Sequence, residues 1–189
     1  IDVHASDIFL KEIVQVRMQK QDEAKLLPYA KMANADLIWI SASATVKEAT
    51  LAHSLNMMGV PTLAIEAGSG MRIDKDYGDQ IVEGILHILK QEGIWQGETT
   101  EVRTPDVAYA EDVDYANANA SGVFMPAVDI GDWVCKGQQV GEGGNGLKGT
   151  VEEIISAPCD GKIITVRQYP IVYHGALMYR ILRKNSLAK

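Results

Sequence analysis

The chain has 189 residues, of which 47% are hydrophobic and 23% are charged, and its formal net charge is −7. This length is enough for one large domain or two small ones, and the composition is typical of a globular protein. The acidic balance argues against nucleic-acid binding, and no apolar run approaches the roughly 18 residues needed to cross a membrane. Its two cysteines, Cys135 and Cys159, are too few for a disulfide framework. We therefore expect a cytoplasmic protein in which both are small core residues.

Short apolar runs alternate with amphipathic stretches over residues 1 to about 95. Helices are expected at 22–35, 45–59 and 76–91, and buried strands at 35–43 and 60–68. Thr45 and Glu48 form a capping-box pattern at the start of the second helix. Strands that alternate with helices predict an α/β fold, with a mostly parallel sheet flanked by helices.

The composition changes after the third expected helix. Residues 92–122 are acidic and poor in aliphatic side chains, which is typical of a linker, with one strand in it. From Val123 onward, short strand patterns alternate with turn residues, and Asn145-Gly146 is a strong hairpin signal. This part predicts a compact all-β domain, either a barrel or a sandwich. We therefore divide the chain into an α/β domain (1–95), a linker (96–120) and a β-domain (121–189).

Two residues at the ends of expected strands are candidates for chemistry. His4 follows a short apolar strand, and Glu66 lies between the run TLAI and the glycine-containing turn AGSG. In open α/β sheets, ligands bind outside the carboxyl ends of the strands, so these two side chains are expected over one crevice. A partly buried carboxylate in such a turn is a candidate general base. Each also has a structural interpretation, as a hydrogen-bonded histidine and as an ion-pair or cap residue.

Two arginines are candidates for binding a substrate carboxylate. Arg17 lies in a stretch of mixed period, and Arg72 follows the glycines after Glu66. The planar guanidinium suits bidentate recognition of a carboxylate, although surface ion pairs are the commoner role.

Other motifs carry less information. The glycine-rich GEGGNG lacks the GK[ST] ending of a phosphate loop, and a hairpin explains it. No HxxE or HExxH motif occurs. Among the remaining histidines, His53 and His87 fall in expected helices and His174 falls in a turn, so none of the three is a candidate site residue.

Three stretches together resemble the succinylglutamate desuccinylase/aspartoacylase family, a group of carboxypeptidase-A-like zinc deacylases. They are IDVHAS with the following IFLKEIVQVRM, then GVPTLAIEAGSG, and then the tail from SGVFMPAVDIGDWVCKGQQVGE to ALMYRIL. Their order and spacing cover nearly the whole chain. The resemblance implies a partial zinc-carboxypeptidase-like sheet followed by the β-domain of the bacterial branch.

The resemblance also implies a site. His4 matches the later histidine ligand of the family's zinc, and Glu66 matches its catalytic glutamate. The other two ligands form an HxxE motif that would precede Ile1, so the chain is expected to be the C-terminal portion of a longer enzyme and inactive alone. An arginine that some members carry before the Gly-x-Pro strand is absent, since HSLNMM stands there. The implied reaction is zinc-dependent hydrolysis of an N-acyl amino acid or related linear amide.

The tail also resembles biotinyl/lipoyl carrier domains, through GDWVCKGQ and APCDG. Lys148 is the candidate for modification. Three functions therefore stay open: a zinc amidohydrolase, a non-catalytic binding protein with an incomplete metal site, and a carrier or oligomerisation module. The expected partners are a small N-acylated substrate, the missing N-terminal segment and further copies of the chain, with neither nucleic acid nor membrane.

Overall fold

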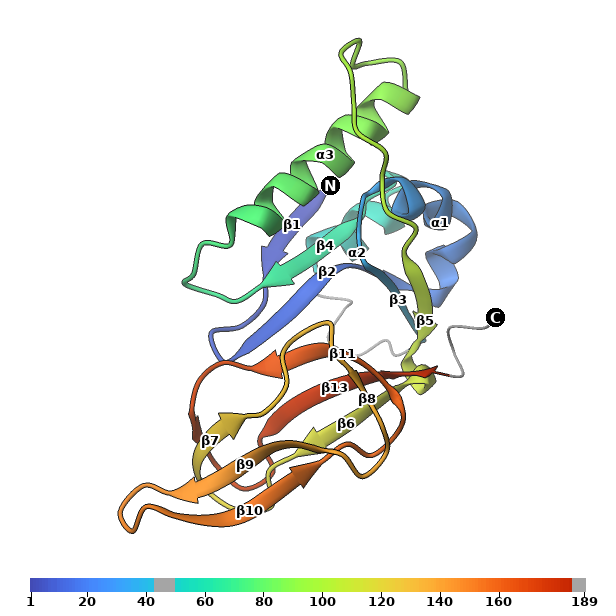
Figure 1. The fold of residues 1–189 in the computed structure, drawn as a ribbon. Helices are drawn as coiled ribbons and strands as arrows, with labels where there is room; N and C mark the ends of the chain where they lie inside the picture. Colours follow the sequence, from blue (N-terminus) through green and yellow to red (C-terminus); the bar gives the residue numbers. More distant parts are fainter. Residues whose placement is uncertain (43–49, 185–189) are drawn as a thin grey trace. The chain divides into compact units, whose positions relative to one another are not determined.

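The computed structural model describes residues 1–42 and 50–184, and the chain divides into two compact units (Figure 1). The first unit comprises residues 1–5, 14–68 and 72–110, and the second comprises residues 6–13, 69–71 and 111–189. The second unit therefore takes two short segments from the N-terminal half of the chain. No local pattern in those segments marks them as belonging to a different unit.

The first unit contains a sheet with helices, so its mixed α/β character is confirmed. Among the described residues, the strands follow the order β1, β4, β2, β3, β5, and the pairings β1–β4, β2–β3 and β3–β5 are parallel. The strands are β1 (Asp2–Ala5), β2 (Leu10–Gln19), β3 (Leu37–Ser41), β4 (Ala64–Gly68) and β5 (Asp106–Tyr109). The helices are η1 (Lys20–Asp22), α1 (Glu23–Met32), α2 (Leu51–Met57) and α3 (Lys75–Gln91).

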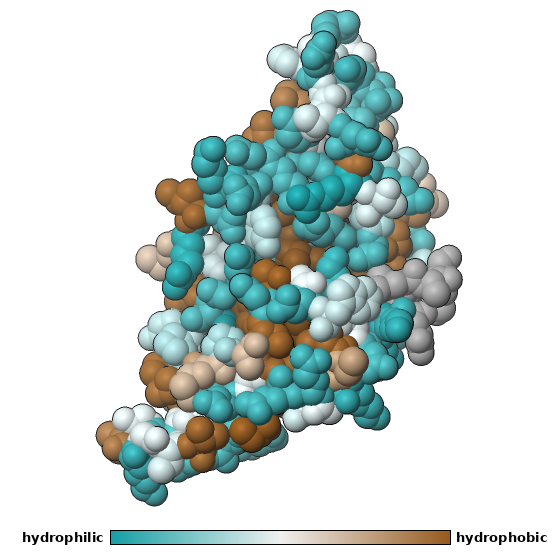
Figure 2. All heavy atoms as spheres, in the orientation of Figure 1, coloured by the Kyte–Doolittle hydropathy of each residue, from teal (hydrophilic) through white to brown (hydrophobic). Residues whose placement is uncertain are grey.

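The core of this unit lies on one face of the sheet, under α1 and α3. Alternate residues of β2, among them Val14 and Val16, pack there with Leu26 of α1 and Ile81 of α3. Glycine at position 84 lets α3 approach the end of α1 closely. A Cβ atom there would overlap the backbone carbonyl of Ala33, which directly follows α1. The outer side of α3 is mostly hydrophilic (Figure 2). Successive side chains of a strand point to opposite faces of the sheet, so Arg17 and Glu66 lie on the other face.

The second unit consists of antiparallel strands in its described part, apart from the 3-10 turn η3 (Ala110–Asp112) that leads into it. Strands β6, β13, β11 and β8 are joined with the first residues of β2, and β12, β7, β9 and β10 form a second sheet. Their bounds are β6 (Val113–Asn117), β7 (Gly122–Pro126), β8 (Trp133–Val134), β9 (Gln139–Asn145), β10 (Thr150–Ser156), β11 (Gly161–Arg167), β12 (Ile171–Val172) and β13 (Leu177–Arg183).

Tyr179 ties the two sheets of this unit together. Its ring is fully buried, packs edge-on against Phe124 at 5.7 Å between centroids, and its hydroxyl donates to the carbonyl of Val140 at 2.5 Å. Burial raises the pKa of Tyr179, so the hydroxyl stays protonated and keeps this hydrogen bond.

Several expectations can be compared with these elements. The helices at 22–35 and 76–91, the strand at 35–43 and the hairpin at Asn145-Gly146 are confirmed as α1, α3, β3 and β9–β10. The capping-box residues Thr45 and Glu48 lie outside the described residues, and α2 is described from Leu51.

Two further expectations differ from the structure. The acidic stretch 96–120 carries two strands, β5 in the first unit and β6 in the second. The expectation that both cysteines are core residues is wrong, because Cys135 is exposed and Cys159 is half-buried. No described helix is long and apolar enough to span a membrane.

Candidate active site

A row of side chains from four strands crosses the face of the first unit's sheet that lies opposite α1 and α3. His4 on β1 is the register partner of Glu66 on β4, and Arg17 on β2 is the register partner of Trp39 on β3. An ion pair joins the two halves of the row, with 2.5 Å between Arg17 Nε and Glu66 Oε2. Register partners on neighbouring parallel strands point the same way, so the sheet brings His4 and Glu66 side by side as expected.

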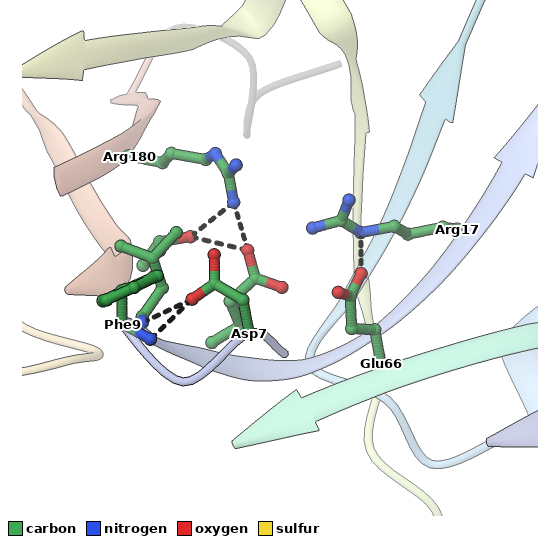
Figure 3. A network of polar contacts seen from close by, with 8 residues as sticks. Asp7, Phe9, Arg17, Glu66 and Arg180 are labelled. Atoms are coloured by element: carbon green, nitrogen blue, oxygen red, sulfur yellow. Dashed lines mark hydrogen bonds and ion pairs between the residues drawn. The ribbon is translucent and has the colours of Figure 1, made fainter. Parts of the chain in front are cut away.

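Arg17 holds Glu66 in place (Figure 3). About a quarter of each side chain is exposed, so water reaches the carboxylate while the protein fixes its orientation. The guanidinium carbon of Arg17 lies 5.1 Å from the ring centroid of Trp39, and this cation–π contact anchors the arginine. The sequence indicated a substrate clamp for Arg17, whereas the structure engages its Nε with the candidate base. Glu66 also lies in the middle of β4 rather than at its end.

His4 is oriented by its neighbour two residues earlier on β1. Its Nε2 lies 2.9 Å from Oδ2 of Asp2, whose side chain is mostly buried. Because this carboxylate lies beside one ring nitrogen, the other, Nδ1, is the candidate metal-binding atom. However, the described residues contain no group of three or more His, Cys, Asp or Glu side chains that could hold one. His4 suits the role of a single zinc ligand, but the described residues do not form a zinc site.

A cavity of about 310 Å³ opens beside this row. It lies between the ends of β2 and β4, the start of α1 and the short helix α2. Its lining includes an apolar group, namely Met18, Leu26 and Ala52, and a polar group, namely His4, Arg17, Gln19, Asp22, Thr50, His53, Asn56, Thr62 and Glu66. The volume suits a small metabolite, and the many polar side chains of the lining favour a polar ligand.

Two residues of α2 shape this cavity. The side-chain amide of Asn56 forms two hydrogen bonds with the backbone of Thr62. It donates to the carbonyl at 2.9 Å and accepts from the N–H at 2.8 Å, which fixes the segment that leads into β4. His53 reaches across to β2, where its Nδ1 lies 3.0 Å from Nε2 of Gln19. His53 was not assigned a site from the sequence, because its place in an expected helix gives no sign of which strand end it meets.

Arg72 is exposed in the segment between β4 and α3 and does not line the cavity, so its role as a substrate clamp stays a prediction. The glycines after Glu66 have roles in backbone conformation and backbone hydrogen bonding. Gly68 has a φ of +65°, and the N–H of Gly70 donates to the carbonyl of Asp7 at 3.0 Å. A Cβ atom at Gly70 would lie 2.9 Å from the carbonyl oxygen of Ser6, so glycine permits this close backbone approach.

Comparison with protein-family models gives no match, and comparison with curated protein sequences gives no significant one. Comparison with solved structures does give matches. The product-bound ectoine utilization protein EutE (DoeB) from Ruegeria pomeroyi aligns with a TM-score of 0.81 and 18% identity, over 95% of this chain and 56% of that one. A succinylglutamate desuccinylase from a Silicibacter species gives 0.80 and 17%, over 96% and 57%. A succinylglutamate desuccinylase/aspartoacylase from Rhodobacter sphaeroides gives 0.78 and 18%, over 95% and 56%.

These likenesses establish the fold. The chain is folded like the succinylglutamate desuccinylase/aspartoacylase proteins, which confirms the resemblance found in the three motifs. The chain spans 56% of the length of the first of these structures.

Proposed function

We propose that this chain is part of a zinc-dependent deacylase that hydrolyses an N-acyl amino acid or a related linear amide, with Glu66 as the general base. The observation that carries the proposal is the placement of Glu66, which lies beside His4 in register, is held by Arg17 and lines a cavity of metabolite size. The fold likeness to proteins named as desuccinylases and aspartoacylases supports the same class of reaction. We also propose that the second unit has a biotinyl/lipoyl-like arrangement and that the protein is cytoplasmic.

The metal would enter the reaction through His4. A bound zinc ion lowers the pKa of a water molecule and polarises a substrate carbonyl. Because the described residues supply one suitable ligand, we propose that the others come from a further polypeptide segment, in keeping with the greater length of the structural neighbours.

The role of Glu66 follows from its geometry. Its carboxylate accepts a proton from water as the water oxygen bonds to the acyl carbon. It then returns that proton to the amine nitrogen as the C–N bond breaks, giving a carboxylic acid and an amino acid. Arg17 is a positioning residue in this scheme, since it holds the carboxylate through its Nε and is itself held over Trp39.

The first test is native mass spectrometry of the purified protein, followed by assays with N-succinyl-L-glutamate and N-acetyl-L-aspartate. One zinc ion together with a second polypeptide segment is the expected composition. Glu66→Gln should retain the zinc and lose at least about a hundredfold in kcat, the scale of general-base catalysis. Glu101→Gln, at an exposed loop position, is the matched control and should keep the wild-type rate. A wild-type rate in Glu66→Gln would refute the assignment.

The position of Lys148 favours a second candidate function, that of a carrier. Lys148 is exposed in the loop between β9 and β10, and its N–H donates to the Asn145 side chain at 3.1 Å. Hydrophobic atoms gather at this hairpin (Figure 2), and Leu147 is fully exposed beside the lysine. A mass increment on the peptide that contains Lys148, present in protein from its native host, would support modification. An unmodified peptide would exclude it.

A further inference from the structure

The ring of His53 is held in one tautomer. The side-chain amide nitrogen of Gln19 is a donor only, and it lies 3.0 Å from Nδ1 of His53. A neutral imidazole has one donor and one acceptor nitrogen, so Nδ1 accepts and Nε2 carries the hydrogen. The backbone N–H of His53 donates to Oγ1 of Thr50, the N-cap of α2, at 3.2 Å. Both the ring and the backbone of this residue are therefore fixed.

The held histidine lines the same cavity as the candidate base. Arg17 and Glu66 lie on its wall, and Asp22 adds a second carboxylate near the start of α1. Of the charged groups, Arg17 already forms an ion pair with Glu66. His53 differs from them in that its imidazole comes from a separate element, the short helix α2.

We propose that His53 is a specificity-determining residue: its Nε2–H donates a hydrogen bond to an oxygen of the N-acyl amino acid, and Gln19 positions the ring for it. This inference rests on the proposed function, because it takes the cavity beside Glu66 as the substrate site. The oxygen belongs either to the acyl carbonyl or to a carboxylate. The apolar side chains of Met18, Leu26 and Ala52 line the same cavity and suit the hydrocarbon part of a short acyl chain.

The experiment begins with nitrogen-15 NMR of the histidine rings in the purified protein. The expected spectrum of His53 shows a protonated Nε2 and an unprotonated Nδ1. N-succinyl-L-glutamate is then titrated in, with N-methylacetamide and acetate as separate probes. A shift of the His53 Nε2 resonance with N-methylacetamide assigns the contact to the acyl carbonyl, and a shift with acetate assigns it to a carboxylate. No shift with any of the three probes would overturn the inference.

Variants separate the donor from the shape of the ring. His53→Phe keeps a planar ring without a donor and should weaken binding of N-succinyl-L-glutamate about three- to tenfold, the scale of one neutral hydrogen bond. His53→Gln retains an N–H donor and should bind more tightly than His53→Phe. Gln19→Met should let the second tautomer appear in the His53 spectrum and should also weaken binding of N-succinyl-L-glutamate, and a purely structural role would not produce the second change. His174→Asn, at an exposed turn, is the control and should bind as wild type does.

The outcomes distinguish this inference from the proposed function. Equal affinity of His53→Phe and the His174→Asn control would overturn the role of His53, even if Glu66→Gln abolishes turnover. Conversely, His53-dependent binding together with a wild-type rate in Glu66→Gln would support His53 as a ligand residue and remove the catalytic role of Glu66.

Discussion

Replacing Arg180 with methionine should destabilise the second unit, because it removes an ion-pair partner of a buried carboxylate. Glu12, near the N-terminal end of β2, is 1% exposed, and its Oε1 is paired with Nη1 of Arg180 on β13. Thr165, which is fully buried on β11, donates to the same carboxylate oxygen at 3.4 Å. The pair therefore spans three neighbouring strand segments of this unit, namely residues 10–13 of β2, β11 and β13.

The magnitude follows from the burial of the two partners. Removing one member of a buried ion pair costs about 3–5 kcal/mol, whereas replacing both with apolar side chains is often neutral or stabilising. Arg180→Met should fall in that range, since Glu12 has no route to water. Glu12→Leu should cost less, because the Arg180 side chain is 18% exposed and its guanidinium can turn toward solvent. The double variant should lie closer to wild type than Arg180→Met does.

Amide hydrogen exchange on β11 and β13 is the suitable assay, since it reports the opening of this unit separately from the first one. The amides of Val166 and Ile181, both buried, should exchange at the global rate of the unit. If Arg180→Met and the double variant are destabilised equally, the cost is that of lost packing, and the argument from the lost ion pair is refuted.

Further predictions concern the cysteines and the glycines of α3. Burial, with a hydrogen bond to an aspartate, raises the pKa of Cys159 to about 11. At pH 8 its thiolate fraction should be about a hundredfold below that of an ordinary cysteine. Iodoacetamide should therefore label the exposed Cys135 first, and equal rates measured by peptide mass spectrometry would contradict this. Gly84→Ala should cost about 1–3 kcal/mol by overlap with backbone. Gly78→Ala, on the same helix with open space around it, should stabilise by up to about 1 kcal/mol; urea denaturation compares the two, and equal effects would contradict the packing argument.

The sequence by itself determined the elements whose signals are local. The apolar periodicity of α3 and the turn residues at Asn145-Gly146 depend on neighbouring positions in the chain, so their helix and hairpin were predictable. His4 and Glu66 were candidates on local grounds too, because both follow apolar runs and each lies in a motif of the family that the chain resembles; their roles stay predictions. The order of these motifs along the chain was enough to predict the family that the fold resembles.

Only the tertiary structure decided which strands meet and in what register. The sequence around Arg17 has no clear periodicity and does not indicate its neighbours. The strand order β4–β2–β3 places Arg17 between Glu66 and Trp39. The contact of His53 with Gln19 likewise depends on where α2 meets the end of β2. The cost of closing such long-range contacts is offset by burial summed over the whole unit, so no short window of sequence carries their signal. The same reason explains why residues 6–13 joined the second unit, since their partners on β11 lie more than a hundred positions away.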